Sequence, residues 1–152
     1  MKLPAESLRA STESRPAMDK VAVETFFKGI EEHDVDLVAP LLAEDAVLEI
    51  PFNASGSAAP AARFEGKKAV MGYLNQIVTS FSRTVLVDKR IYAAEEETVF
   101  FEAKGDLVHA VSGATYKNQY VFKFVFRSNL ISQISEYSNP VIYAKLVGAP
   151  IG

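Results

Sequence analysis

The chain has 152 residues, of which 49% are hydrophobic and 23% are charged, and its formal net charge is -3. This length and balance predict a single globular domain. The acidic net charge disfavours nucleic-acid binding, because a phosphate-binding surface concentrates Lys and Arg on one face. The absence of cysteine excludes disulfides, thiol nucleophiles and thiolate metal sites. Since the sequence has only two histidines, we expect no metal site and no cofactor.

Hydropathy argues against a membrane-spanning protein and against a secreted protein. No apolar run approaches the roughly 20 residues of a membrane-spanning helix. The opening MKLPAESLRASTESRPAMDK lacks the apolar stretch of a secretory signal. We therefore expect a cytoplasmic protein with no membrane partner.

The N-terminal third of the chain predicts a tail followed by two helices. Residues 1–17 are polar and unpatterned, which predicts a disordered tail ahead of one domain over residues 18–152. Asp19 is the candidate N-cap of a first helix, and Asp34 that of a shorter one near Pro40. The apolar face of the first helix would consist of Val23, Phe26, Phe27 and Ile30.

The middle of the chain predicts a strand, a loop and a third helix. The stretch AVLEIPF is typical of a strand that stops at Pro51, and a loop rich in small residues follows over residues 53–63. This loop either covers the mouth of a pocket, as mobile lids do, or is a surface connection. Gly66 precedes a helix whose apolar face would consist of Val70, Tyr73, Leu74 and Ile77.

The remainder of the chain alternates with period two and predicts an antiparallel meander. The expected strands are 84–93, 98–109, 116–127 and 130–138, and a short helical turn follows at 140–146. Helices first and a long meander afterwards indicate an α+β fold. We expect a cone-shaped roll, in which N-terminal helices pack on a curved, mainly antiparallel sheet around an internal pocket.

Four stretches, AEDAVLEIPF, FEGKKAVMGYL, YKNQYVFKF and SEYSNP, resemble the nuclear transport factor 2-like superfamily, which includes ketosteroid isomerases and SnoaL-type polyketide cyclases. The resemblance spans roughly residues 20–148. The last two stretches are most similar to the phenazine-biosynthesis A/B proteins. The resemblance implies the fold above but no single activity, since this fold hosts isomerases, cyclases, hydrolases and binding modules.

The sequence lacks the reactive residues of the ketosteroid isomerases at the corresponding positions. Phe26 stands at the position of their oxyanion tyrosine, Ile50 at that of their catalytic base, and Phe122 near that of their protonated aspartate. Phe and Ile neither accept the substrate proton nor donate to an oxyanion, so we expect no steroid isomerisation by that mechanism.

The phenazine-type resemblance identifies two candidate residues. Glu136 matches the pocket glutamate that lies just before the Asn-Pro of the last strand, and Tyr73 stands where those proteins carry a pocket histidine. A tyrosine donates a hydrogen bond but is a poor proton shuttle at neutral pH, because its ordinary pKa is about 10. Tyr73 would therefore orient a ligand.

The direction of Glu136 follows from strand alternation. Ile134 and Glu136 share one face of the last strand. If Ile134 faces the core, Glu136 faces the pocket, where burial raises the pKa of a carboxyl and suits it to proton transfer. The alternative is a carboxylate in water or in an ion pair.

Other candidates lie on the sheet and beside the loop. The face Asn118, Tyr120, Phe122, Phe124 and Phe126 is the expected concave face of its strand. We expect Asn118, Tyr120 and Phe122 to bind substrate, although Asn118 could instead satisfy its own turn and Tyr120 could pack in the core. Phe52 and Phe64 flank the loop and are further substrate-binding candidates. His109 is a second catalytic candidate, because its ordinary pKa lies near physiological pH, and the alternative is a solvated histidine at a strand end.

Two functions remain open from the sequence. The first is a cofactor-independent enzyme of the isomerase, cyclase or condensation type that moves protons on a hydrophobic, oxygenated or aromatic metabolite. The second is a non-catalytic module that binds a small molecule or another protein. The outer face of the strand expected at 116–127, where Val121 and Val125 alternate with Lys123, fits either solvent or a contact between two sheets. Since many proteins of the superfamily that the chain resembles dimerise there, the resemblance implies a homodimer through the outer face of the sheet.

Overall fold

The computed structural model describes the backbone of residues 5–152 and the side chains of residues 15–152. Its helices are α1 (Ala5–Glu31), α2 (Lys67–Ser80) and α3 (Pro140–Val147), with short 3-10 turns η1 (Val35–Leu37) and η2 (Ala39–Leu41). Its strands are β1 (Leu42–Ile50), β2 (Ala62–Glu65), β3 (Phe81–Ala94), β4 (Thr98–His109), β5 (Thr115–Tyr116), β6 (Gln119–Arg127) and β7 (Leu130–Ser138). In this part of the chain no helix combines the length and the apolar character needed to cross a membrane.

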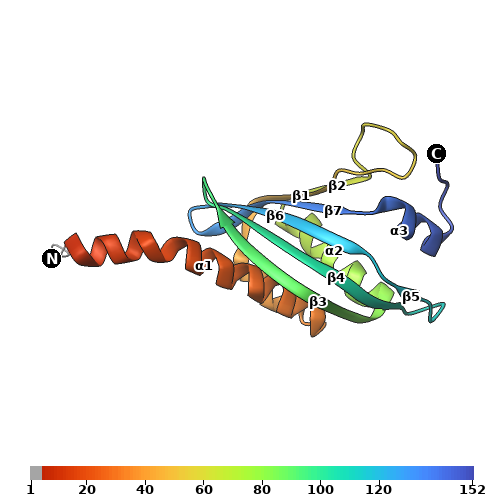
Figure 1. The fold of residues 1–152 in the computed structure, drawn as a ribbon, viewed down its shortest axis with the longest axis horizontal. Coiled ribbons are helices and arrows are strands. Elements are labelled where there is room, and N and C mark those ends of the chain that lie inside the picture. The colour runs from red at the N-terminus through yellow and green to blue at the C-terminus, as the bar shows by residue number, and fades with distance from the viewer. Residues whose placement is uncertain (1–4) are drawn as a thin grey trace.

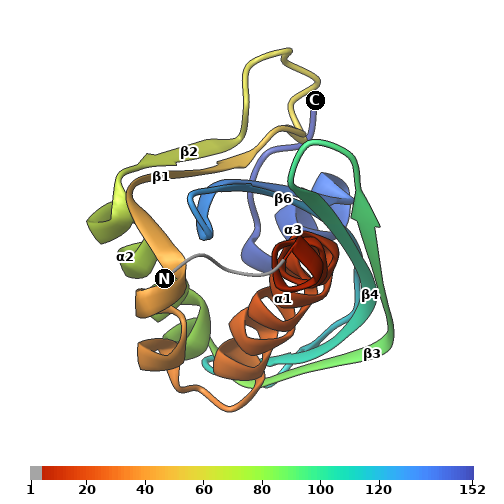
Figure 2. The same ribbon diagram turned by 90° about the vertical axis from the view of Figure 1, so that its left-hand side faces the viewer.

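The strands form one curled sheet in the order β2-β1-β7-β6-β4-β3, with β5 paired to β4. Every pairing is antiparallel except that of β1 with β7, which is parallel. The sheet wraps around the C-terminal half of α1, and α2 lies on the opposite side of the roll from β3 and β4 (Figure 2). The N-terminal half of α1 projects beyond the sheet (Figure 1). The expected α+β cone is confirmed.

Bulges help the sheet to curl. The register of β3 against β4 shifts between Val87 and Arg90, and Asp88 within this shift has a φ of 53°. The pairing of β1 with β7 shifts between Leu42 and Val47. An extra residue in one strand bends it and increases its twist, so these shifts turn a flat meander into a roll.

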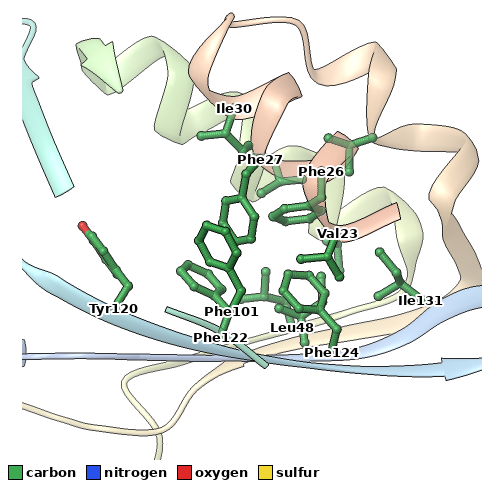
Figure 3. Packing of buried hydrophobic residues seen from close by; sticks show 14 of the residues in the cluster. Val23, Phe26, Phe27, Ile30, Leu48, Phe101, Tyr120, Phe122, Phe124 and Ile131 are labelled. Carbon is green, nitrogen blue, oxygen red and sulfur yellow. The ribbon is translucent and has the colours of Figure 1, made fainter. Parts of the chain in front are cut away.

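Phenylalanine rings pack between α1 and the sheet (Figure 3). The predicted apolar face of α1 is buried, and the Phe27 ring stacks on Phe101 with centroids 3.9 Å apart. Phe122 meets Phe27 edge to face at 4.9 Å. The predicted alternation of β6 is confirmed, since Phe124 is fully buried whereas Val121 is 40% exposed. Aromatic packing therefore fixes α1 on the concave face of the sheet.

The helix expected to begin at Asp19 begins at Ala5 instead, so α1 continues through most of the segment expected to be a tail. Asp19 lies within the helix and is 6% exposed. The segment from Ala5 is rich in helix-forming Ala, Glu, Leu and Arg, which is the physical reason. Residues 1–4 lie outside the described residues, and the division into a tail and a domain stays a prediction.

Three further elements differ from expectation. The short helix after Asp34 consists of the turns η1 and η2. The loop over residues 53–63 gives way at Ala62 to strand β2, which pairs with β1. The strand expected over 116–127 divides into β5 and β6, because the Asn118 side chain accepts the backbone N–H of Gln119 at 2.8 Å and breaks the ladder.

The absence of a side chain at Gly105 lets the Tyr120 ring approach the backbone of β4 closely. A Cβ at Gly105 would lie 2.7 Å from Tyr120 Cε2 and 2.9 Å from Leu107 Cδ1. Gly72, on α2, has no atom within 4 Å of such a Cβ. A methyl group would therefore clash with its neighbours at Gly105 but not at Gly72.

We expect Gly105→Ala to lower the free energy of unfolding by about 1–3 kcal/mol, because the added methyl displaces the Tyr120 ring. The matched variant Gly72→Ala should raise it by roughly 0.5–1 kcal/mol, because alanine is the better helix former and meets no neighbour. Urea denaturation measures both. Equal effects of the two substitutions would contradict the close approach at Gly105.

Candidate active site

A cavity of about 680 Å³ lies inside the roll, and the helices α1, α2 and α3 and the concave face of the sheet contribute to its wall. Most of its wall is apolar. Its ionisable side chains come from α2, β5, β6, β7 and α3, and they are Tyr73, Tyr116, Tyr120, Glu136 and Tyr143. None of the described lining residues is Lys, Arg, His or Asp. A single carboxyl group therefore shares this cavity with several tyrosines and no counter-cation.

Glu136 points into this cavity because of the register of β7. Ile134, two residues earlier on the same face, is fully buried in the core, and Phe122 on β6 is the direct partner of Glu136. The Tyr73 hydroxyl donates a hydrogen bond of 3.0 Å to Glu136 Oε1. Oε2 has no hydrogen-bond partner in the part of the chain that the structure describes. One carboxyl oxygen is therefore held by the protein and the other is available to a ligand.

Burial raises the pKa of Glu136 to about 7, and the hydrogen bond from Tyr73 opposes this rise. Burial also raises the pKa of Tyr73 well above its ordinary value, and the charge and hydrogen bond of Glu136 add to the effect. Tyr73 consequently stays a hydrogen-bond donor at neutral pH. Glu136 can take up or release a proton in the same pH range, as a general acid or base requires.

Helix α2 and strand β2 hold Tyr73 in place. Val70 and Leu74 on the same helix face are buried, which turns Tyr73 toward the sheet. The Phe64 ring from β2 stacks on the Tyr73 ring with centroids 4.6 Å apart. Phe64 lines the cavity as expected, and so does Phe52, which is 53% exposed and lies at the edge of the cavity.

The concave face of β6 also contributes to the wall. Tyr120 and Phe122 both line the cavity, as expected. Phe26, Ile50 and Phe122, the positions compared with the ketosteroid isomerases, all lie on this wall. Because these three side chains are apolar, the acid, base and oxyanion groups of that mechanism are missing from their usual places.

Asn118 does not line the cavity, contrary to expectation. Its Nδ2 donates to Tyr116 Oη at 2.7 Å and to the Asn139 carbonyl at 3.0 Å. Its Oδ1 accepts the backbone N–H groups of Gln119 and Asn139 at 2.8 and 3.1 Å. All of its polar capacity is used to join the start of β6 to the end of β7, so Asn118 has no group left for a substrate.

His109 does not line the cavity either. It lies at the end of β4, where Nδ1 is 3.0 Å from Ser112 Oγ in the turn toward β5, and its ring packs edge to face on Phe81. Its neighbours Leu107 and Phe81 line the cavity whereas His109 does not, so the geometry does not support His109 as a catalytic residue.

Two lining tyrosines escaped the sequence analysis. Tyr116 precedes Asn118 and Tyr120 with the same period of two, and this pattern was the signal that could have identified it. Tyr143 lies on α3, and its ring meets that of Tyr116 at 5.9 Å. No local pattern places α3 over the cavity, so Tyr143 could not have been found from the sequence.

The loop after β1 borders the cavity. Asn53, Ala54 and Ser55 line it, and Asn53 Oδ1 accepts the backbone N–H of Ser55 at 3.0 Å. The Gly152 N–H donates to the Ala54 carbonyl at 3.1 Å, so the loop also contacts the last residue of the chain. Movement of this loop as a lid stays a prediction.

The raised pKa of Glu136 makes stability depend on pH. A carboxyl with a pKa of about 7 in the folded protein and 4.5 in the unfolded chain binds more protons when folded, so stability falls as pH rises through this window. Between pH 5 and pH 8 we expect the wild type to lose roughly 2–3 kcal/mol relative to Glu136→Gln. Urea denaturation of both proteins across this range measures the difference. Parallel stability profiles would show that Glu136 titrates normally.

Comparisons with known proteins agree with this architecture. The model of the SnoaL-like domain family matches residues 23–134. A candidate isomerase from Bacillus subtilis superimposes with a TM-score of 0.77 at 22% identity, covering 90% of this chain and 97% of that one. A candidate polyketide cyclase from Xanthomonas campestris gives a TM-score of 0.74 at 22% identity, covering 88% of this chain and 99% of the other.

The phenazine biosynthesis-related protein of Pseudomonas aeruginosa is also similar, with a TM-score of 0.72 at 15% identity over 93% of this chain and 94% of that one. No curated protein shows significant similarity. Identities this low establish a shared fold and no shared activity. The family match covers most of the domain, and on that evidence the chain belongs to the SnoaL-like domain family, with the nuclear transport factor 2-like fold.

Proposed function

We propose that this protein is a cofactor-independent enzyme that catalyses a proton transfer of the isomerase, cyclase or condensation type on a hydrophobic, oxygenated or aromatic metabolite. The observation that carries the proposal is the Glu136 carboxyl in an apolar cavity. Burial raises its pKa to about 7, and Oε2 has no protein partner among the described residues. A buried carboxyl with this pKa is suited to both halves of a proton transfer at neutral pH.

In the proposed reaction, the Glu136 carboxylate takes a proton from an acidic C–H of the ligand. In an isomerisation it returns this proton at another carbon; in a cyclisation the resulting carbanion attacks a carbonyl carbon of the ligand, and the proton goes to the oxygen of that carbonyl. Tyr73 holds Oε1 and thereby fixes the direction of Oε2. The apolar wall excludes water, which strengthens electrostatic interactions with the charge that develops on the ligand. The names of the similar Bacillus and Xanthomonas proteins describe an isomerase and a cyclase, which are the enzyme types proposed here.

The rival proposal is a module that binds a small molecule in the same cavity without transforming it. It shares the apolar wall but gives no reason for a buried carboxyl with no counter-cation, since a binding pocket of this kind is more stable without one. This observation favours the enzyme.

Proton exchange on a generic ketone tests catalysis before the natural substrate is known. We expect the wild type to accelerate deuterium uptake from D2O into 2-tetralone, measured by mass spectrometry at pH 8. Glu136→Gln should lose about a hundredfold or more of this acceleration, because a positioned general base contributes 10²–10⁴-fold.

Tyr137→Phe is the matched control, because Tyr137 follows Glu136 on β7 but does not line the cavity. It should retain the wild-type rate. An undiminished rate in Glu136→Gln would refute the role of Glu136. No acceleration by any of the proteins, together with a co-purified small molecule in gentle-release mass spectrometry, would favour the binding module.

We also propose a homodimer through the outer face of the sheet. Val121 on β6 is 40% exposed and Tyr92 on β3 is 48% exposed. Phe100 on β4 pairs directly with Tyr92 on β3 and with Lys123 on β6, two residues along the strand from Val121. Neighbouring apolar side chains on three adjacent strands are suited to an isologous contact between two copies.

Val121→Asp should therefore convert the dimer into a monomer, because it places a charge at the centre of this contact. Sedimentation velocity measures the change. Val111→Asp is the matched control, since Val111 is 91% exposed in the turn between β4 and β5 and should leave the dimer intact. A wild-type protein that sediments as a monomer would contradict the proposed contact.

A further inference from the structure

Glu136 has no cationic partner in the described part of the chain. None of the described residues that line its cavity is Lys, Arg or His. Burial and the hydrogen bond from Tyr73 are the causes of its pKa shift, and no charged side chain is among them. By contrast, Asp45 on the surface is paired with Arg127 at 2.6 Å. When Glu136 ionises, its charge is therefore left unpaired in an apolar space, which is unfavourable unless a ligand supplies the opposite charge.

The wall around Glu136 is aromatic. Phe122 is its direct partner on β6, and Tyr120 lies two residues along the same face of that strand. Tyr73 comes from α2 and Tyr143 from α3. Aromatic rings attract cations, because their π faces carry partial negative charge. The carboxyl group and the rings together favour a positively charged ligand over a neutral ligand of the same shape.

We infer that the substrate is a hydrophobic cyclic imine, bound in its protonated iminium form with the positive charge beside the Glu136 carboxylate. This inference rests on the proposed function. The carboxylate takes a proton from the carbon next to the C=N group, the C–H electron pair forms a C=C bond, and the π electrons of the C=N bond become a lone pair on nitrogen. The products are a neutral enamine and a neutral carboxyl group. Return of the proton to a different carbon of a conjugated enamine gives an isomerised iminium ion.

The charge balance of the cavity distinguishes this substrate from a neutral one. With a neutral substrate, the cavity holds one unpaired negative charge before and after the proton transfer. With an iminium ion, the charges cancel on binding, and the transfer converts an ion pair into two neutral groups. An apolar cavity favours this loss of charge, because buried ions are costly. A fixed Lys or Arg would hold Glu136 ionised, whereas the charge of the iminium disappears in the same step.

The apolar wall positions Phe26, Ile50 and Phe122 agree with this substrate. In a carbonyl compound, the electrons of the broken C–H bond end on oxygen as a negative charge that the protein must stabilise. In an iminium ion they end on nitrogen as a neutral lone pair. No oxyanion forms, so the reaction needs no charged or acidic group at these three positions.

Three bicyclic ligands of similar shape test the charge preference by calorimetry at pH 8. They are the cation 2-aminotetralin, the neutral 2-tetralol and the anion tetralin-2-carboxylate. We expect the wild type to bind the amine about tenfold or more tightly than the alcohol, the effect of one hydrogen bond to a charged group, and to bind the carboxylate most weakly. Glu136→Gln should lose this preference for the amine and keep its affinity for the alcohol.

Tyr137→Phe is the control and should bind all three ligands as the wild type does, because Tyr137 does not line the cavity. Equal affinity of the wild type for the amine and the alcohol would overturn the inference. No binding of the amine, or an undiminished preference for it in Glu136→Gln, would overturn it as well.

The pH dependence of amine binding is a second test, and it serves on the wild type alone if Glu136→Gln does not fold. The titratable groups that face Glu136 are Tyr73 from α2, Tyr116 from β5, Tyr120 from β6 and Tyr143 from α3, and the described lining residues of the other elements carry none. Burial raises the pKa values of Tyr73, Tyr116 and Tyr120, so these three stay uncharged.

Glu136 therefore controls the profile. The cation binds the ionised carboxylate, whose fraction grows as pH rises through the pKa of about 7. Between pH 5.5 and pH 8, where the amine stays protonated, its affinity should rise about thirtyfold. Glu136→Gln should bind it equally across this range. A flat profile in the wild type would contradict the inference.

Turnover is measured separately, because a bound cation would give even a non-catalytic pocket a use for Glu136. The probe is 1-methyl-3,4-dihydroisoquinoline, a cyclic imine close in size to 2-tetralone. Deuterium uptake from D2O into its methyl group, followed by NMR, should be accelerated by a larger factor than uptake into 2-tetralone. Glu136→Gln should lose the acceleration.

The two proposals fail separately in this design. A preference for the amine without exchange on either compound would refute the proposed function and leave the cation site standing. Exchange on 2-tetralone without a preference for the amine would leave the function standing and refute the iminium substrate.

Discussion

The site depends on the register of β7. This strand lies between β1 and β6, which places Ile134 beside Leu48 and Phe124, and Glu136 beside Phe122. Because side chains alternate along a strand, burial of Ile134 in the core directs Glu136 to the concave face. A slip of one residue would expose Glu136 to solvent and turn Tyr137 inward. The apolar core therefore determines where the carboxyl group lies.

Burial without a counter-cation gives this carboxyl its chemistry. Among the residues that the structure describes, Tyr73 supplies one hydrogen bond and no cationic side chain lines the cavity, so the neutral and ionised forms of Glu136 are close in free energy at neutral pH. An ion pair with Lys or Arg would have held the group ionised and made it a weak base. The folded state consequently retains a group that is unfavourable for stability at alkaline pH and useful for proton transfer.

The residues that line the cavity illustrate that proteins with the same fold need not share a mechanism. At the wall positions that correspond to the reactive groups of ketosteroid isomerases, this chain has the apolar residues Phe26, Ile50 and Phe122. The polar groups of this chain come instead from α2, β5 and β7, where Tyr73, Tyr116 and Glu136 lie. A curled sheet packed on helices creates an enclosed space at its open end, and many wall positions can carry the reactive side chains. Shared architecture at 15–22% identity therefore does not transfer a mechanism.

The sequence by itself determined the meander and the shared face of Ile134 and Glu136. The period-two pattern of β6 and the left-handed turn at Ser128 and Asn129 are local signals, and a hairpin turn sets the pairing of the strands that it joins. Only the tertiary structure decided the parallel pairing of β1 with β7, the contact between Tyr73 and Glu136, and the use of Asn118 to hold Tyr116 and the start of α3. Tyr73 and Glu136 are 63 residues apart, and local conformational preferences carry no information about which distant segments meet. Packing of α1 and α2 into the curled sheet makes that choice, because it buries the most apolar surface.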